Sequence, residues 1–240
     1  MGVGRETGAA LGVLAAAQVA KARLAPGPGN AVSVVATAAL AGVARRAGLT
    51  RAQVGLGADG LARGARHGAV AACCVAGAYA CGTVLPATRA LFADRRAAPD
   101  LPGLLRQALL DVPVGTVLLE EAAFRGVLPA LLARRWGTRR ADAVAAALFG
   151  LWHVAPSAAL VEANPALARA SAAGVPAGSG AARWATAAGN VAAGALGGLA
   201  LGALRRRGGL LAPALAHTAL NAFGFVAAHL VGRARREAAR

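Results

Sequence analysis

The sequence is poor in charged and aromatic side chains. Charged residues make up 15% of the chain, whereas a soluble domain usually has about 25%. Acidic residues are scarcer than basic ones, with 10 Asp and Glu against 26 Lys and Arg, which gives a net charge of +16. With 4% aromatic residues there is no basic stripe with interleaved rings, so we predict no nucleic-acid partner. The three cysteines, Cys73, Cys74 and Cys81, lack metal-like spacing, and we interpret them as small packing residues.

Apolar residues, in contrast, make up 57% of the chain, and the mean hydropathy is +0.55. The few charges leave long uncharged runs between them, each close to the roughly 20 residues that a helix needs to cross a bilayer. These runs are Leu24–Ala44, His67–Thr88, Ala143–Val161, Trp184–Leu204 and Gly208–Gly232. None alternates polar and apolar residues as a barrel strand would. The pattern predicts an all-α, multi-pass transmembrane helical bundle with the lipid bilayer as its partner.

Two further segments bring the expected number of helices to about seven. Thr7–Ala20 is apolar but short and contains Gln18. It fits either the apolar region of a signal peptide or a retained first helix extended by a snorkelling Lys21, and we favour the retained helix. Gln107–Ala133 is apolar except for Asp111, Glu120, Glu121 and Arg125.

The basic residues gather at the ends of the runs, which is the positive-inside pattern and places these loops on the cytoplasmic face. They are Arg45, Arg46, Arg51, Arg63, Arg66, Arg134, Arg135, Arg139, Arg140, Arg205, Arg206 and Arg207. With seven alternating helices the basic tail falls on the other side, so either one span is miscounted or the tail is an exception. We predict N-terminal transmembrane helices over residues 1–103, a second group of transmembrane helices over 104–232 and a basic tail over 233–240. Glu162–Arg183 is the expected non-cytoplasmic loop.

One uncharged run shows a packing pattern. Gly194, Gly198 and Gly202 repeat every four residues, which allows helices to approach closely in lipid. Asn190 in the same run is predicted to form an interhelical hydrogen bond.

A few polar residues interrupt the apolar segments, where a charge costs about 2.5–3.5 kcal/mol, so they are candidates for function. They form three groups: Glu120, Glu121 and Arg125; Phe149 and His153; His217 and Asn221. Glu121 and Arg125 are four residues apart and are predicted to pair, which leaves Glu120 as the unpaired carboxylate. Counted from the nearest basic cluster at 1.5 Å per residue, Glu120, His153 and His217 lie at about 21, 20 and 15 Å. We therefore expect one site between three helices of the C-terminal half.

These groups allow two kinds of peptide-bond hydrolysis. A carboxylate and a histidine can activate water while another histidine and an asparagine hold the oxyanion. Alternatively, Glu120, His153 and His217 can hold a Zn²⁺ ion whose bound water attacks. The residues leave open whether the cofactor is Zn²⁺ or none. Arg125 would repel a cation and Asn221 is a poor zinc ligand, which favours the metal-free reading.

The ordered motifs Glu-Glu-x-x-x-Arg, Phe-x-x-x-His and His-x-x-x-Asn resemble the CPBP family of CAAX prenyl endopeptidase-like and bacteriocin-processing intramembrane proteases, also called Abi proteins. The resemblance covers roughly Leu104–Leu230 and implies that residues 104–232 form the catalytic transmembrane core. It implies a membrane protease in which Glu120 and His153 activate water, His217 and Asn221 stabilise the oxyanion, and Glu121 and Arg125 hold the site together. The implied partner is a protein or peptide substrate, with lipidation left open.

Two alternative functions from other classes remain open. The same polar groups would suit a proton or cation path in a transporter, or a bacteriocin-immunity or binding protein without turnover. The alanine- and arginine-rich composition is typical of a high-GC bacterial genome, so we expect the protein in a bacterial cell membrane.

Overall fold

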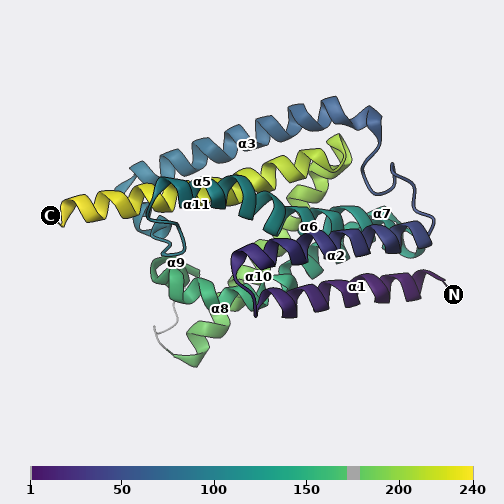
Figure 1. Cartoon of the computed structure of the whole chain (residues 1–240), viewed down its shortest axis with the longest axis horizontal. Coiled ribbons are helices and arrows are strands. Elements are labelled where there is room, and N and C mark those ends of the chain that lie inside the picture. Colours follow the sequence, from purple (N-terminus) through teal and green to yellow (C-terminus); the bar gives the residue numbers. More distant parts are fainter. Residues whose placement is uncertain (1, 172–178, 240) are drawn as a thin grey trace.

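The chain folds into a bundle of helices that run roughly along one direction (Figure 1). The computed structural model describes residues 2–171 and 179–239, and within these ranges it contains helices and turns but no strand. The longer elements are α1 (Gly2–Lys21), α2 (Pro26–Arg46), α3 (Leu61–Val84), α7 (Leu128–Trp152), α10 (Gly180–Gly208) and α11 (Leu211–Ala238). The shorter ones are η1 (Ala58–Gly60), α4 (Pro86–Arg89), η2 (Ala90–Phe92), α5 (Leu101–Arg106), η3 (Gln107–Val117), α6 (Leu118–Glu121), η4 (Ala122–Val127), α8 (Val154–Ala163) and α9 (Pro165–Ser171). The predicted all-α fold is confirmed.

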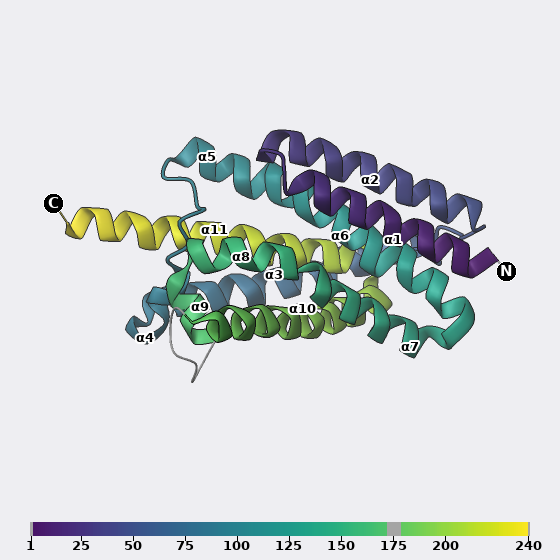
Figure 2. The ribbon, with the colours of Figure 1, turned by 90° about the horizontal axis from the view of Figure 1, so that it is seen from below.

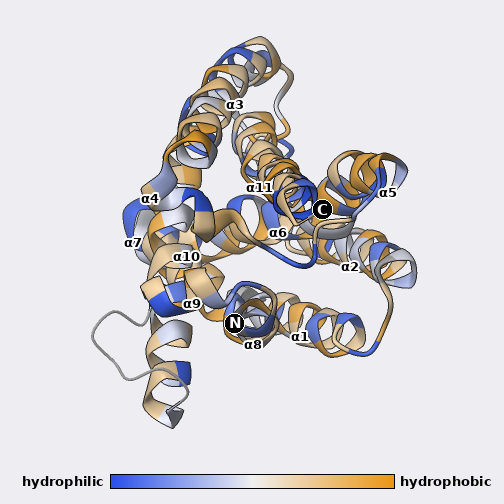
Figure 3. Cartoon of the chain, turned by 90° about the vertical axis from the view of Figure 1, so that its left-hand side faces the viewer, coloured by the Kyte–Doolittle hydropathy of each residue, from blue (hydrophilic) through white to orange (hydrophobic). Residues whose placement is uncertain are grey.

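Four of the described helices are long and apolar enough to cross a membrane: Gly27–Arg46, Ala58–Val84, Gly180–Gly208 and Leu211–Ala238. Large apolar side chains on them face outward; Val84 and Trp184, for example, are 77% and 76% exposed. Figure 3 shows apolar colouring on the outward sides of the helices as well as between them. Such a surface suits lipid, where helices satisfy their own backbone. The chain is an integral membrane protein, and about seven helices remains an approximate count.

The first helix belongs to the body of the bundle, beside α2 (Figure 2). Ala10, Leu14 and Ala17 of α1 are buried in a core that also contains Phe124 and Phe149. This packing agrees with a retained first helix. The prediction that Lys21 snorkels is wrong, because its ammonium group donates to the Ser33 hydroxyl at 3.1 Å and to the Gly115 carbonyl.

The predicted span Ala143–Val161 is not one helix. Helix α7 ends at Trp152 and α8 begins at Val154. The sequence contains the reason: Pro156 has no N–H, so the Trp152 carbonyl four residues earlier cannot form its α-helical hydrogen bond. A short helix, α9, also lies within the predicted loop Glu162–Arg183, whose residues 172–178 fall outside the described residues.

At one end of the bundle, arginines of α7 and α10 bond to the connection between α2 and η1 and to Asp142. The Arg134 guanidinium donates to the Ala47 and Gly48 carbonyls at 2.6 and 3.1 Å. Arg205 donates to the Gln53 carbonyl at 2.7 Å, and Arg206 pairs with Asp142 at 2.5 Å. Helix α11 carries the basic tail to the opposite end, where the C-terminus lies (Figure 1). The basic tail therefore lies at the end of the bundle opposite the arginine-rich segments that follow the positive-inside pattern.

Close packing of α7 against α10 depends on two of the three glycines in the predicted pattern. A Cβ at Gly194 would lie 3.1 Å from Gly150 Cα, and one at Gly198 would lie 3.0 Å from Ala146 Cα. Within the described structure, a Cβ at Gly202 would meet nothing within 4 Å. The small residues at 194 and 198 therefore bring the two helix backbones together, while Gly202 does not take part.

This difference gives a test of the packing with a control in the same helix. We expect Gly198→Leu to lower the free energy of unfolding by about 1–3 kcal/mol, because the larger side chain must push α7 away. Gly202→Leu should leave it nearly unchanged. Thermal unfolding of both variants in the same detergent measures this, and equal loss of stability in both would contradict the proposed contact.

Candidate active site

The two glutamates lie on a helical stretch whose hydrogen bonding is irregular on both sides. The π-helical segments η3 and η4 flank α6, the four-residue element that carries Glu120 and Glu121. Such π-helical turns occur often at functional sites. Pro129 has no N–H to offer to the Arg125 carbonyl four residues before it, and Arg205 Nε of α10 donates to that carbonyl at 3.2 Å. A side chain from another helix thus satisfies the backbone beside the predicted site.

Glu121, Arg125 and His217 form one buried cluster. Arg125 Nη1 lies 3.0 Å from Glu121 Oε1, and the two side chains are 1% and 2% exposed. His217 Nδ1 is 2.7 Å from the same Glu121 oxygen, which can only accept, so this ring nitrogen carries the proton. The Arg125 guanidinium also stacks on Phe149, 3.8 Å from the ring centre. The predicted ion pair is therefore present, and it also orients His217.

Glu120 occupies the other side of the His217 ring. Its Oε2 is 3.7 Å from His217 Nε2, and its Oε1 accepts a hydrogen bond from Trp152 Nε1 at 2.9 Å. Oε2 itself is buried and has no hydrogen-bond partner among the described residues. Glu120 thus presents one fixed and one unoccupied carboxylate oxygen beside an imidazole.

His153 approaches this cluster without touching Glu120. It caps α7, and its Nδ1 lies 2.7 Å from the Phe149 carbonyl, so Nδ1 is the protonated nitrogen and Nε2 is free to accept a proton. The Phe149 ring contacts both imidazoles edge-on, with centroids 4.6 Å from His153 and 5.8 Å from His217. Phe149 therefore packs against His153, as predicted, and also contacts His217.

A short chain of hydrogen bonds fixes the backbone at His153. The Ser157 hydroxyl donates to the His153 carbonyl at 2.6 Å, and Asn190 of α10 donates to that hydroxyl at 3.1 Å. The prediction that Asn190 forms an interhelical hydrogen bond is confirmed.

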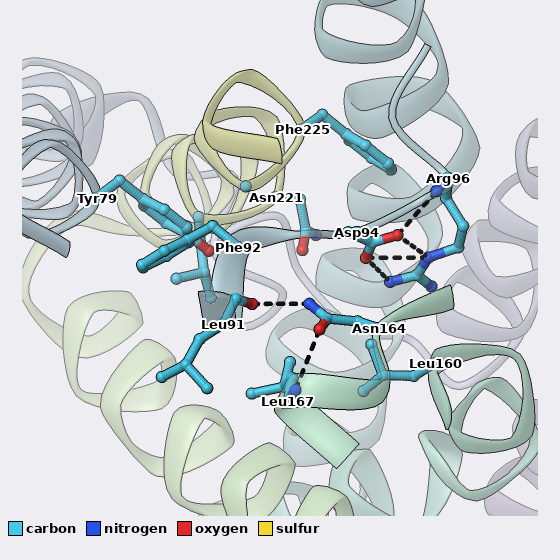
Figure 4. A pocket seen from close by; sticks show the side chains of 12 residues that line it. Tyr79, Leu91, Phe92, Asp94, Arg96, Leu160, Asn164, Leu167, Asn221 and Phe225 are labelled. Carbon is cyan, nitrogen blue, oxygen red and sulfur yellow. Dashed lines mark hydrogen bonds and ion pairs between the residues drawn. The ribbon is translucent and has the colours of Figure 1, made fainter. Parts of the chain in front are cut away.

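Asn221 lies one helical turn beyond His217 and lines a pocket of about 380 Å³ (Figure 4). Of the six predicted residues, the structure brings Glu120, Glu121, Arg125 and His217 into direct contact. His153 joins them through the Phe149 ring, and Asn221 lies in the pocket wall.

Two residues beside Glu120 were missed by the motifs. Trp152 donates to the carboxylate, and Gln18 of α1 donates from Nε2 to the Trp152 carbonyl at 3.1 Å. This is the carbonyl that Pro156 leaves without a helical partner. The sequence does contain signals for both: a proline four residues after Trp152, and a lone amide in an apolar first helix.

The donors considered for Zn²⁺ do not converge as a set of three. Glu120 and His217 face one another, whereas no hydrogen bond or ion pair among the described residues joins His153 to either of them. No group of three or more histidine, cysteine, aspartate or glutamate residues in the described ranges is arranged to hold a metal ion.

The sequence profile of the type II CAAX prenyl endopeptidase Rce1-like family matches residues 103–223, half of the chain. The chain belongs to this family. Neither the curated proteins nor the solved structures contain a significant match. The matched region includes all six predicted residues, whereas Gln18 and the helices α1 to α3 lie outside it. Membership agrees with the family that the three motifs predicted.

The contact between Trp152 and Glu120 can be tested in an assay of peptide cleavage. Trp152→Phe keeps an aromatic ring against Phe124, whose centroid is 5.9 Å away, but removes the N–H that holds Glu120. We expect kcat to fall by about 10- to 100-fold, because misplaced reacting groups cost that much. Thermal unfolding should change little. Trp184→Phe at an exposed position serves as the control, and wild-type kcat in Trp152→Phe would show that the hydrogen bond has no role.

Proposed function

We propose that this chain is an intramembrane endopeptidase that hydrolyses a peptide bond of a membrane-associated protein or peptide with water activated by Glu120. The observation that supports it most directly is the buried Glu120 Oε2, which has no hydrogen-bond partner among the described residues and faces His217 Nε2 at 3.7 Å. The family supplies the reaction class, since CAAX prenyl endopeptidases cleave peptide bonds. The cell membrane of a bacterium is the proposed location.

In the proposed reaction Glu120 accepts a proton from water as the water oxygen attacks the substrate carbonyl carbon. The Trp152 hydrogen bond keeps Oε1 in place, so Oε2 is the oxygen that takes the proton. His153 accepts through its free Nε2 and helps to orient the water. The proton then passes to the leaving nitrogen as the carbon–nitrogen bond breaks, which leaves a carboxylic acid and an amine.

The oxyanion of the tetrahedral intermediate needs hydrogen-bond donors in a site shielded from water. We assign this role to Asn221 and His217, which share one face of α11. Because His217 Nδ1 already donates to Glu121, His217 donates to the oxyanion from Nε2 as the doubly protonated imidazolium. Glu121 accepts from His217 Nδ1 and so sets the direction of the opposite nitrogen. Arg125 balances the charge of Glu121 at 3.0 Å, which lets the carboxylate remain buried.

The substrate is proposed only as a protein or peptide at the membrane. The family description names a prenylated CAAX substrate, and lipidation of the substrate of this chain is one form that the proposal allows. An enzyme embedded in lipid through apolar helices meets substrates that share the bilayer, which is why we expect a membrane-associated peptide.

Substitution of Glu120 tests the proposed reaction. We expect Glu120→Gln to reduce cleavage of a peptide library by about 10²- to 10⁴-fold, because the amide cannot accept the proton from water. Expression and membrane insertion should remain, since glutamine keeps the shape and can still accept from Trp152. Undiminished cleavage by the purified variant would overturn the protease proposal, and altered ion flux alone would favour a transporter.

The choice between Zn²⁺ and no metal is tested separately. The Arg125 charge beside Glu121 favours a reaction without a metal ion. We expect purified, active protein to contain no stoichiometric zinc and to keep its activity after treatment with a chelator. Activity lost to the chelator and restored by added zinc would contradict this expectation.

A further inference from the structure

The pocket that contains Asn221 has walls that come mainly from outside the three motifs. It lies between α3, the segment around η2, α8, α9 and α11, and has a volume of about 380 Å³ (Figure 4). Sites for small ligands usually range from about 300 to 1,000 Å³. This volume is therefore enough for one or two side chains, but not for a folded segment of a protein.

Most of the wall is apolar, and aromatic rings form one side of it. Tyr79 of α3 and Phe92 of η2 meet edge-on with centroids 5.6 Å apart, and Phe225 of α11 lines the same pocket. In Figure 4, Tyr79 and Phe92 lie on one side of Asn221 and Phe225 lies on the other. Such a surface favours aliphatic or aromatic groups.

The charged groups of the wall are already paired. Asp94 accepts from Arg96 Nη2 at 2.6 Å and from the Arg96 backbone N–H at 2.9 Å. Burial by itself raises the pKa of the Asp94 carboxyl, but the hydrogen bonds and charge of Arg96 outweigh burial and bring the pKa below its ordinary value. Asp94 is therefore ionised, and its charge is neutralised by Arg96. The pocket offers no unpaired charge to a charged ligand.

The amide groups of the wall differ from one another. Asn164 donates to the Leu91 carbonyl at 2.7 Å and accepts from the Leu167 N–H at 3.1 Å. Asn221, in contrast, has no hydrogen-bond partner among the described residues, although its side chain points into the pocket. An unpaired amide in an apolar wall is available to a ligand with a polar backbone.

We propose that this pocket is a specificity subsite that receives an uncharged, apolar side chain of the peptide substrate, close to the cleaved bond. The inference rests on the proposed protease function. Asn221 is one turn, about 6 Å, from His217 along α11, and an extended peptide advances about 3.3 Å per residue. The side chain in the pocket therefore belongs to a residue within two positions of the reacting carbonyl. Tyr79, Phe92 and Phe225 are then specificity-determining residues.

Changes of pocket size in opposite directions test the proposal. The substrates are peptides that the wild-type protein cleaves, varied one residue at a time at two positions on each side of the bond, with Ala, Leu, Phe, Trp or Asp. For Phe225→Ala, which enlarges the pocket, we expect the ratio of kcat/KM for Trp over Leu at one position to rise about tenfold. For Leu167→Phe, which fills it, the same ratio should fall by a similar factor. Asp should be the poorest residue at that position throughout.

Leu230→Ala, at an exposed apolar position of α11 outside the pocket, is the matched control and should leave every ratio at its wild-type value. Each ratio compares two peptides with one variant, so a partial loss of folded enzyme does not alter it. If both pocket variants cleave with wild-type ratios, the subsite proposal is wrong while the protease remains. If the wild-type protein cleaves no peptide, the proposed function itself fails, and the subsite with it.

Discussion

The structure of the predicted site depends on one ion pair buried within the bundle, Glu121 with Arg125. Both side chains are almost fully buried, and a charge inside a bilayer costs several kcal/mol unless a partner compensates for it. Arg125 provides that compensation, and the same Glu121 oxygen accepts a hydrogen bond from His217. That contact fixes the imidazole, whose other nitrogen then faces Glu120. The arrangement separates two adjacent carboxylates into a structural one and one that remains available for chemistry.

Prolines beside the site connect it to distant parts of the chain. Pro129 and Pro156 each leave a backbone carbonyl without its helical donor, at Arg125 and Trp152 respectively. Arg205 of α10 donates to the first carbonyl and Gln18 of α1 to the second. A carbonyl without a hydrogen bond in an apolar environment destabilises the fold, so these two donors stabilise it. Helices outside the three motifs therefore hold the backbone on which Glu120 and its neighbours are placed.

The sequence predicts those features that depend on local spacing. Long uncharged runs predict the helices, and the spacing of four residues predicts the pair of Glu121 and Arg125. The contact of Trp152 with Glu120 could not be predicted in this way, because it requires the helix break before Pro156 and the packing of residues 32 positions apart. Likewise, the pocket at Asn221 brings together side chains from Tyr79 to Phe225, so no single motif describes it. The continuous span at Ala143–Val161 was predicted from hydropathy, which does not register the missing N–H of a proline.

The central claim is that helices far apart in the sequence bring Glu120 and His217 together in a buried site inside the membrane. An experimental structure of the full chain in a lipid nanodisc would test it most directly. The account predicts a separation of about 4 Å or less between Glu120 Oε2 and His217 Nε2, with both side chains turned away from lipid. Side chains that face the lipid, or that lie beyond each other's reach, would contradict it.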